Sequence, residues 1–364
     1  MRFGIRWLLT TLAMISITGC KDGEAPTSTD EQNSPVAETG ATDSHASAVL
    51  PDDDALYPPA PDLPPAPDTI RIAVISDVNG SYGSTTYLPT VHAAIQDIIR
   101  RKANIVISPG DLVAGQKPGL DYADMWRAFH FNIADVFFDN DIEFVWAPGN
   151  HDASAYPGFE QEREAYRLAW EARRPKAELL PGSHYPFYYA VIIRDILIVS
   201  LDITRPFSVD AAQLDWLETT LREHQNVRAS LVMGHLPLEP ARYAQFWEVA
   251  GEPRLLKILK KEKATFYISG HHHVFYAGHD EELRTIFCPA LGANPRAFTR
   301  DDSARGGYVM IELPPEGPAT VRALVAPDYT HMIDLKSLPE RLINIEREDL
   351  GMANYIIELL DRQP

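Results

Sequence analysis

Cysteine is scarce in this chain: Cys20 and Cys288 are the only two among 364 residues. Since Cys20 lies near the N-terminus, only Cys288 remains in the rest of the chain, and an internal disulfide framework is excluded. Cys288 lies in the apolar run TIFC and is interpreted as a core residue.

Basic residues are also few relative to acidic ones. Lys and Arg number 33 against 51 Asp and Glu, so the formal net charge is −18, of which residues 70–364 carry −10. An acidic domain is a poor electrostatic match for nucleic-acid backbones or anionic lipid, so nucleic acid is not expected as a partner. A small anionic substrate would have to be attracted by local charge, which metal ions could supply.

The N-terminal apolar run, Trp7–Thr18, falls short of the ~20 residues that a membrane-spanning helix needs. Two arginines precede it and ITGC ends it, so residues 1–19 are predicted to be a signal peptide. The ITGC end resembles the lipobox of bacterial lipoproteins, in which Cys20 becomes the lipidated first residue. That resemblance implies a membrane anchor at the bacterial cell envelope, and Lys21 favours the outer membrane. An ordinary signal peptide with a chance cysteine is the alternative.

Residues 20–69 are predicted to be a disordered tether. They are rich in Pro, Ser, Thr, Ala and Asp and end in PPAPDLPPAPD. Such a composition buries too little apolar surface to fold and favours extended polyproline segments.

Five apolar, β-branched runs follow, and each ends in a short polar motif. The runs are IRIAVIS, NIVIS, EFVWA, SLVM and TFYIS, and the motifs after them begin at Asp77, Gly110, Gly149, Gly234 and Gly270. Short apolar runs between helical segments are typical of buried strands in a layered α/β fold. Active sites of such folds lie at the carboxyl ends of the strands, so we expect the polar side chains to converge at one edge of one sheet.

The motifs read DVN, GDLV, GNHD, GH and GHHH, in that order. Any one of them alone would be weak evidence, but five in order after strand-like runs are strong. The pattern resembles the calcineurin-like metallophosphoesterase superfamily, whose signature is DxH, GDxx, GNHD or GNHE, GH and GHxH. This resemblance implies a four-layer α/β/β/α sandwich with two mixed sheets, assigned here to residues 70–330.

The resemblance also implies a site for two divalent or trivalent transition-metal ions. Asp111 would bridge them, His151 would act on the transition state, and the remaining ligands would be Asp77, Asn79 and His273 at the first ion and Asn150, His235 and His271 at the second. Such a mixed ligand set suits Mn, Fe, Zn or Ni without choosing among them. Two divalent ions and two ionised aspartates leave a charge of +2, which matches a phosphate ester as substrate.

Two departures from the family pattern stand out. Asn79 occupies a position that the family gives to His, so the first metal site is expected to be the weaker one. Many relatives carry an acid three or four residues after the GD aspartate to orient the catalytic His, whereas this chain has Ala114 and Gly115. The purple acid phosphatase branch uses a Tyr ligand in that stretch, and its absence disfavours that branch.

Each residue also has a plainer interpretation when taken singly. His235 could be structural, GHHH could be a chance cluster, and the two aspartates could be helix caps. His272 could contact substrate or face solvent. Taken together, the motifs predict a dinuclear-metal phosphoesterase acting on a phosphomonoester or phosphodiester. The alternative is a catalytically weakened relative that serves as a binding module, and a nuclease is disfavoured by the net charge.

The remaining elements are predicted from hydrophobic spacing. Helices are expected over Leu88–Lys102, Asp121–Asn140, Glu160–Arg173 and Val209–Gln225, and within Ala241–Lys263. The runs VFYAG, LRTIFC, GYVMIEL and TVRALVA are expected to form antiparallel strands of the second sheet. A helical extension is expected over residues 331–364, with its helix at Leu338–Asp361.

Overall fold

The computed structural model describes residues 57–61, 67–241, 248–296, 305–343 and 358–362. The predicted signal peptide, Cys20 and most of the predicted tether lie outside these residues. No helix in the described part of the chain is long and apolar enough to cross a membrane.

The first of two mixed sheets has six strands, in the order β12-β11-β10-β1-β2-β3. β1, β2 and β3 run parallel, and β10, β11 and β12 add to β1 in antiparallel fashion. The bounds are Ile70–Val74 for β1, Ile105–Ser108 for β2, Glu143–Trp146 for β3, Gly307–Leu313 for β10, Thr320–Val325 for β11 and His331–Met332 for β12.

The second sheet has eight strands, in the order β13-β14-β8-β9-β7-β6-β5-β4. β5, β6, β7 and β9 are parallel to one another, and the other strands pair in antiparallel fashion. The bounds are Tyr189–Ile193 for β4, Ile196–Ser200 for β5, Ala229–Met233 for β6, Phe266–Ser269 for β7, Tyr276–Asp280 for β8, Leu283–Phe287 for β9, Arg341–Ile343 for β13 and Glu358–Arg362 for β14.

The alternation of side chains along each strand creates the layers. In β1, Ile72 and Val74 face the eight-stranded sheet, and together with residues such as Ile198 and Leu231 they form a core between the sheets. Ala73 faces the other way, into a second core under helices, and Val199 and its neighbours do the same on the outer face of the eight-stranded sheet.

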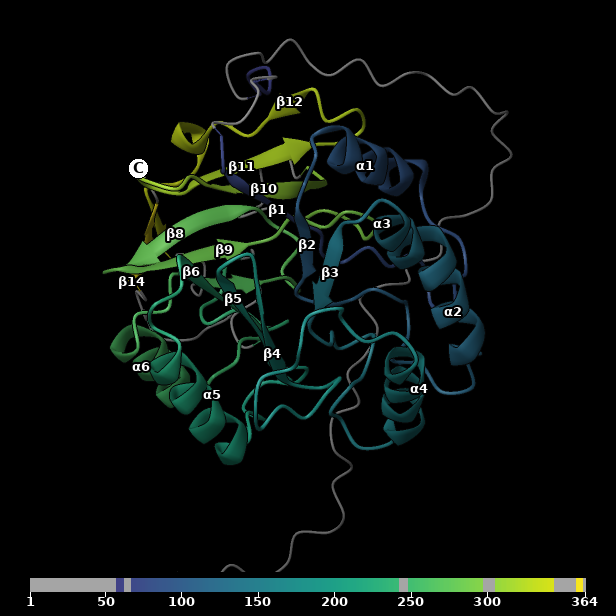
Figure 1. Cartoon of the computed structure of the whole chain (residues 1–364). Helices are drawn as coiled ribbons and strands as arrows, with labels where there is room; N and C mark the ends of the chain where they lie inside the picture. The colour runs from purple at the N-terminus through teal and green to yellow at the C-terminus, as the bar shows by residue number, and fades with distance from the viewer. Residues whose placement is uncertain (1–56, 62–66, 242–247, 297–304, 344–357, 363–364) are drawn as a thin grey trace, which may run out of the picture. The chain divides into compact units, whose positions relative to one another are not determined.

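Helices cover both outer faces, which confirms the predicted four-layer α/β/β/α sandwich (Figure 1). α1 to α4 pack against the six-stranded sheet, and α5 and α6 pack against the eight-stranded sheet. The bounds are Pro89–Arg100 for α1, Tyr122–Phe129 for α2, Asp135–Asp139 for α3, Glu160–Glu171 for α4, Ala211–Glu223 for α5 and Pro253–Lys261 for α6, with a π-helical turn η1 at His130–Ala134 and a 3₁₀ turn η2 at Leu335–Ser337.

Two predictions about the sheets are wrong. The five motif-bearing strands do not share one sheet, because β1, β2 and β3 lie in the six-stranded sheet while β6 and β7 lie in the other. The runs GYVMIEL and TVRALVA form β10 and β11, which extend the first sheet beside β1 and not the second. The alternating pattern predicts a strand but carries no information about its partner, which long-range packing decides.

The prediction of a C-terminal helix is also wrong for the described residues. Within 338–343 and 358–362 the chain forms β13 and β14, and β14 pairs with β8 through Asp361 and Arg362. The open edge of β8 offers unpaired backbone groups, and pairing with them outweighs a local helical preference. At the other end, Pro59 bridges His331 of β12, so residues 57–61 of the predicted tether lie against the domain.

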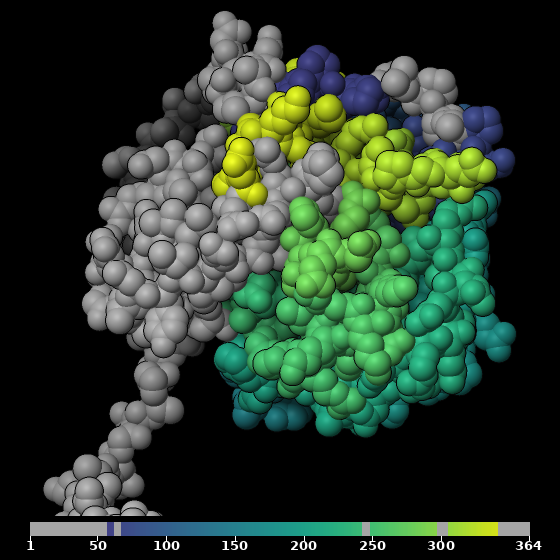
Figure 2. Space-filling view, turned by 90° about the vertical axis from the view of Figure 1, so that its left-hand side faces the viewer, coloured from purple at the N-terminus to yellow at the C-terminus, as the bar shows by residue number. Residues whose placement is uncertain are grey.

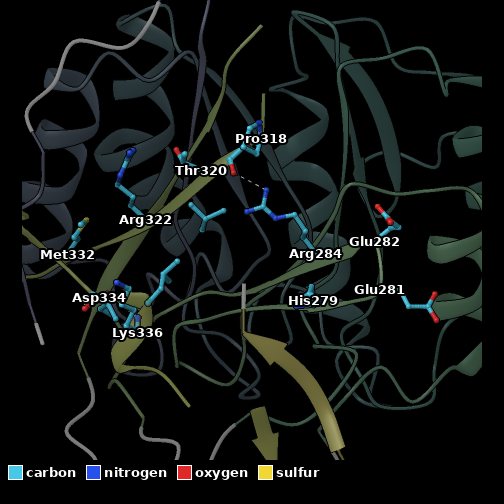
Figure 3. Close-up of a pocket in the computed structure, with 14 residues that line it drawn as sticks. His279, Glu281, Glu282, Arg284, Pro318, Thr320, Arg322, Met332, Asp334 and Lys336 are labelled. Carbon is cyan, nitrogen blue, oxygen red and sulfur yellow. Dashed lines mark hydrogen bonds between the residues drawn. The ribbon is translucent and has the colours of Figure 1, made fainter. Parts of the chain in front are cut away.

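A groove of about 820 Å³ lies at the far edge of the sheets from the motifs (Figure 3). It is lined by the β8–β9 turn, the start of β11 and η2, and Arg284 Nη1 donates to Ala319 O across it at 3.1 Å. On the face shown in Figure 2, yellow-green residues that follow position 305 lie above green residues that precede position 297. β9 is parallel to β7 and begins at this groove, whereas the motif GHHH follows the end of β7. The groove is therefore separate from the predicted site.

Candidate metal centre

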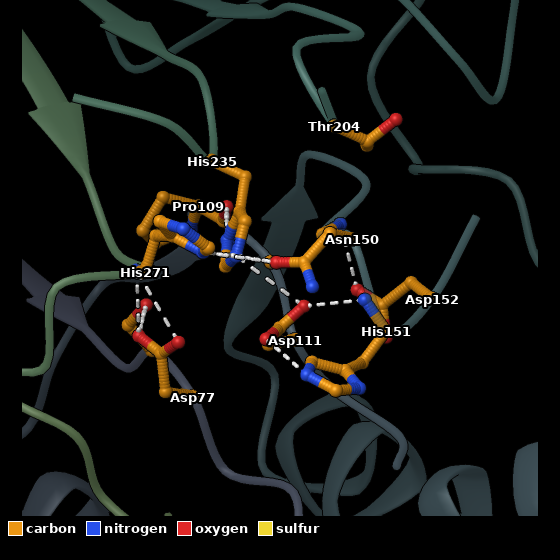
Figure 4. Close-up of polar contacts among 12 residues, drawn as sticks. Asp77, Pro109, Asp111, Asn150, His151, Asp152, Thr204, His235 and His271 are labelled. Carbon is orange, nitrogen blue, oxygen red and sulfur yellow. Dashed lines mark hydrogen bonds and ion pairs between the residues drawn. The ribbon is translucent and has the colours of Figure 1, made fainter. Parts of the chain in front are cut away.

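The predicted ligands come together where strands of both sheets end (Figure 4). Asp77 follows β1, Asp111 follows β2 and Asn150 follows β3, while His235 follows β6 and His271 follows β7. The site is thus formed at the seam between the two sheets, with ligands contributed by each.

The loops of the first sheet are hydrogen-bonded to one another beneath the ligands. Asp77 N donates to Gly110 O at 3.1 Å, and Asn79 N donates to Asp111 O at 3.2 Å. Gly110 and Gly149 are in direct backbone contact: a Cβ added to Gly149 would lie 2.1 Å from Asp111 N, and one added to Gly110 would lie 2.6 Å from Gly149 Cα. Neither position has room for a side chain, which explains the glycines of both motifs.

Asp152, the last residue of the GNHD motif, joins the loop after β2 to the loop after β3 by hydrogen bonds. Its Oδ1 accepts from Leu112 N at 2.8 Å and from Val113 N at 2.9 Å, and its Oδ2 accepts from Gly149 N at 2.9 Å. The side chain is buried, and backbone N–H groups contact both of its oxygens. Its role is therefore to hold Asp111 and Asn150 at a constant separation.

Four of the predicted ligands have left-handed backbone conformations. The φ angles are 50° at Asp77, 57° at Asp111, 64° at His271 and 56° at His273. This region is uncommon for residues other than glycine, and it costs on the order of 1–2 kcal/mol per residue. Its concentration at one site is typical of functional positions, where the surroundings impose the conformation.

Four of the predicted ligands surround one point. Asn150 Oδ1 lies 2.8 Å from His235 Nε2 and 2.9 Å from His271 Nδ1, and these two nitrogens are 3.2 Å apart. Asp111 Oδ1 lies 3.4 Å from His235 Nε2. These are the residues that the family resemblance assigns to the second ion.

A second group adjoins it on the side of Asp77. His273 Nε2 lies 3.1 Å from Asp77 Oδ1, and Ser76 Oγ donates to Asp77 Oδ2 at 2.6 Å. Asn79 is 6% exposed, and its Oδ1 is buried without a hydrogen-bond partner among the described residues. Carboxylate and imidazole atoms of Asp77, Asp111 and His235 lie within 4.8 Å of one another, so the two groups are contiguous.

The donor set fits metal ions. Bonds of about 2.0–2.2 Å to a metal place neighbouring ligand atoms about 3.0–3.5 Å apart, close to the separations of 2.8–3.4 Å found here. The outer nitrogen of each histidine is engaged: His235 Nδ1 is 3.1 Å from Pro109 O, His271 Nε2 is 2.9 Å from Glu248 Oε2, and His273 Nδ1 is 2.8 Å from Asn294 O. A donor on the outer nitrogen leaves the inner nitrogen as an acceptor, as in metal-binding histidines.

The charges of the site reinforce this arrangement. Burial would raise the pKa of Asp77, but the charge and hydrogen bond of His273, together with the charge of His235, outweigh it and the pKa is lowered. Burial acts on Asp111 in the same way, and there the charges of His235 and His151 together with their hydrogen bonds lower the pKa. Burial would lower the pKa of His235, but Asp111 raises it to about 9. Two ionised carboxylates therefore hold a positive charge at the centre of the site: a proton on His235, or a metal ion that would displace that proton from Nε2.

The family model for calcineurin-like phosphoesterases matches residues 70–275, which is more than half of the chain. The chain belongs to this family. The predicted resemblance is thereby confirmed. A search of the curated proteins found no match.

Among solved structures, a purple acid phosphatase from yellow lupin (Lupinus luteus) seeds superposes with a TM-score of 0.54 at 15% identity, covering 75% of this chain and 54% of the lupin protein. The chain thus spans about half the length of that relative, and the likeness is one of fold. A dimetal phosphatase from Danio rerio gives a TM-score of 0.47 at 14% identity, covering 72% of this chain and 98% of the fish protein.

His151 of this phosphoesterase is oriented by a backbone carbonyl and not by an acid. Its Nδ1 is 3.1 Å from Gly115 O, its Nε2 is 4.0 Å from Asp111 Oδ2, and its ring centroid is 5.5 Å from that of Tyr82. The backbone carbonyl of Gly115 therefore contacts His151 Nδ1 in the place where the family resemblance implies an acidic side chain.

His272 neither faces solvent nor points into the ligand cluster. It is buried, its Nδ1 accepts from Ala241 N at 3.1 Å, and its Nε2 is 3.0 Å from Glu248 O. The middle histidine of GHHH therefore fixes the chain at Ala241 and Glu248, on either side of residues 242–247.

Three supporting residues outside the motifs were not predicted from the sequence, and Asp152 within GNHD was not predicted either. Gln116 Oε1 accepts from Asn150 Nδ2 at 2.9 Å, Glu248 accepts from His271, and Glu162 lies behind the GD loop. None of them belongs to a motif, and each acts across a long separation in sequence. Asp152 could have been found, since it is part of GNHD.

Proposed function

We propose that this phosphoesterase hydrolyses a phosphomonoester or a phosphodiester with two metal ions held by Asp77, Asn79, His273 and Asp111 on one side and by Asp111, Asn150, His235 and His271 on the other. One observation carries the proposal: three histidines from two loops, the buried His235 and the partly buried His271 and His273, each turn a nitrogen toward an aspartate or Asn150. When bound, such a pair of ions supplies Lewis acidity toward the phosphoryl group and lowers the pKa of a water molecule.

The residues of this chain have distinct tasks in the proposal. Asp111 lies between the two ligand groups and is within reach of His235 at 3.4 Å, which supports a bridging role. Asn150 is held by Gln116, so its oxygen faces the histidines and its nitrogen does not. Both aspartates are buried, which excludes competing water from their oxygens.

His151 is the proposed acid. With its Nδ1 engaged by Gly115 O, its Nε2 is the nitrogen that faces the cluster, and it can hold a proton for the leaving oxygen of the ester. It can also donate a hydrogen bond to the negative charge that develops on the phosphoryl oxygens. It lies 4.0 Å from Asp111 Oδ2, which is adjacent to the proposed ligands without being one of them.

The direct test is hydrolysis of p-nitrophenyl phosphate and bis(p-nitrophenyl) phosphate by the purified protein with Mn²⁺, Fe²⁺, Zn²⁺ or Ni²⁺. Asp111→Ala should lose both ions by elemental analysis and nearly all turnover. Asp195→Ala is the matched control, because Asp195 also has a left-handed φ, 69°, but lies in the β4–β5 turn. Two ions retained in Asp111→Ala would refute the bridging assignment.

The alternative function, a binding module with weakened catalysis, is tested by the same experiment. Two tightly bound ions without turnover of either ester, with every metal, would favour it. The completeness of the ligand set and the orientation of His151 favour the enzyme.

The cell envelope is the proposed location, with Cys20 as the lipidated residue. The support is the charged start, the short apolar run and ITGC. Two or more lipid chains hold a protein stably at a membrane. Cys20→Ala should move the protein from the membrane fraction to the soluble fraction of cells that express it, and unchanged sedimentation would refute the anchor.

A further inference from the structure

The turn at Gly115–Gln116 contacts both functional residues of the GNHD loop. Gly115 N donates to His151 O at 2.9 Å, and Gly115 O lies 3.1 Å from His151 Nδ1. Gln116 Oε1 accepts from Asn150 Nδ2 at 2.9 Å. The position of this turn therefore decides the orientation of the His151 ring and of the Asn150 amide.

Glu162 of α4 holds the turn from behind. Its Oε2 accepts from Gln116 N, and its Oε1 accepts from Ser154 N at 2.7 Å. The side chain is completely buried. One carboxylate therefore joins the turn after the GD motif to the segment after GNHD.

The turn is packed closely against His151 and Glu162, without room for a side chain at Gly115. A Cβ added to Gly115 would lie 2.3 Å from His151 O and 2.8 Å from Glu162 Oε2. Gln116 itself has a left-handed φ of 61°, a conformation that needs support from its surroundings. Glu162 provides that support at the backbone N–H of Gln116.

A carboxylate in this position requires an explanation, because its burial is unfavourable. Burial raises the pKa of Glu162 to about 7, and the N–H groups of Ser154 and Gln116 counter that effect. A neutral side chain would fill the same space without this penalty. What the carboxylate adds is two acceptors for two backbone donors.

We propose that Glu162 is a positioning residue of the hydrolytic reaction, acting through the Gly115–Gln116 turn on His151. The predicted effect of Glu162 on catalysis rests on the proposed function, whereas its effect on the orientation of His151 does not. In this scheme Glu162 keeps Gly115 O on His151 Nδ1. Nδ1 then carries the proton of neutral His151, and Nε2, which faces the cluster, takes up the second proton that it passes to the leaving oxygen.

Glu162→Gln is the informative substitution because it conserves shape. Its amide nitrogen must face one of the two N–H donors, so one of the two contacts is lost. We expect kcat for an alkyl phosphate to fall about 10–100-fold with little change in KM. The loss should be smaller for p-nitrophenyl phosphate, whose leaving group needs no proton.

A double substitution separates positioning from a general structural role. If Glu162 acts through His151, then Glu162→Gln should add less than about threefold to the loss already caused by His151→Ala. Glu262→Gln is the matched control, since Glu262 is a buried glutamate at the end of α6 that accepts from Gln225 Nε2 at 3.1 Å. It should change neither kcat nor the dependence on the leaving group.

The tautomer of His151 gives a readout that does not depend on activity. In ¹⁵N-histidine-labelled protein, the two-bond nitrogen–proton spectrum should show His151 protonated at Nδ1, with its signals assigned by their loss in His151→Ala. Glu162→Gln should shift this signature toward a mixture of tautomers. Gly115→Ala, which displaces the turn directly, should do the same and serves if Glu162→Gln does not fold.

Two results would overturn the proposal. One is an unchanged His151 tautomer in both variants. The other is a loss in Glu162→Gln that is equal for good and poor leaving groups and fully multiplicative with His151→Ala. Absence of hydrolysis by the wild type with every metal would refute the proposed function instead, and the tautomer measurement would still decide whether Glu162 positions His151.

Discussion

Replacing Asn79 by Leu should separate the stability of the metal-free protein from its response to metal. Asn79 is almost completely buried and its Oδ1 has no hydrogen-bond partner among the described residues. An unsatisfied buried acceptor costs about 1–3 kcal/mol, whereas a bound cation would satisfy it. Leu has a similar volume and no acceptor. The metal-free variant should therefore be as stable as the wild type or more stable, by up to about 3 kcal/mol.

The stabilisation that bound metal provides should, in contrast, be smaller in Asn79→Leu than in the wild type. Binding to the native state alone stabilises it by RT ln(1 + [L]/Kd), so each tenfold loss of affinity removes about 1.4 kcal/mol at a fixed excess of metal. For a domain of this size that is a shift of roughly 3–6 °C in Tm. Asn79→His should restore or exceed the wild-type shift, because imidazole is the better donor to mid-series transition metals.

The assay is thermal unfolding of wild type, Asn79→Leu and Asn79→His, each stripped of metal and then titrated with Mn²⁺. Asn104→Leu is the matched control, because Asn104 Oδ1 accepts from Arg71 N at 2.8 Å at the start of β2, away from the site. That variant should be destabilised equally with and without metal. Asn79 would not be a metal ligand if Asn79→Leu destabilised the metal-free protein as Asn104→Leu does and left the metal-induced shift unchanged.

Three further predictions concern other parts of the structure. His151→Ala should keep both ions by elemental analysis while kcat falls on the order of 10²–10⁴-fold, less for nitrophenyl esters; loss of an ion would make His151 a ligand. Gly149→Ala places a methyl group 2.1 Å from Asp111 N. It should lower the free energy of unfolding by about 1–3 kcal/mol and weaken metal binding. Normal metal content in this variant would show that the close contact of the two loops is not needed to hold the ligands. Burial, reinforced by the charge of Arg173, lowers the pKa of His130 from 6.5 to about 4. The free energy of unfolding should therefore fall by up to about 3 kcal/mol as pH drops from 6.5 to 4. Denaturant titrations at several pH values should show a weaker pH dependence of that free energy for His130→Phe, and an identical dependence would exclude His130 as the cause.

The family resemblance implied the four layers, while short-range patterns predicted the strands and the residues that follow them. IRIAVIS is predominantly apolar, as a strand buried on both faces is, and the motif after each strand places its ligand at a strand end. The helices α1, α4 and α5 begin within two residues of the predicted starts for the same reason. Their spacing of apolar residues is local information.

What could not be predicted depends on contacts between distant segments. The pairing of β10 with β1 joins Leu313 to Ile70, and no pattern within GYVMIEL distinguishes this partner from a strand of the other sheet. Gly115 O replaces a missing acid through its main chain, which leaves no trace in residue identity. Glu248 and Glu162 are ordinary glutamates in the sequence and differ from others only by the histidine and the turn that they contact.

The ligands are positioned by loop-to-loop contacts more than by the strands that precede them. Four ligands have left-handed φ angles that cost on the order of 1–2 kcal/mol each, and a loop without support would relax from them. The support is the set of main-chain bonds between the loops, together with the carboxylate of Asp152, which accepts three backbone N–H groups. Removing that carboxylate should therefore impair the site although Asp152 touches no ion. Asp152→Asn keeps the shape but turns an amide toward Gly149 N or toward Leu112 N and Val113 N, so it should lower metal affinity as a ligand substitution does. Equal metal affinity in Asp152→Asn and wild type would show that the strands alone suffice to hold the ligands.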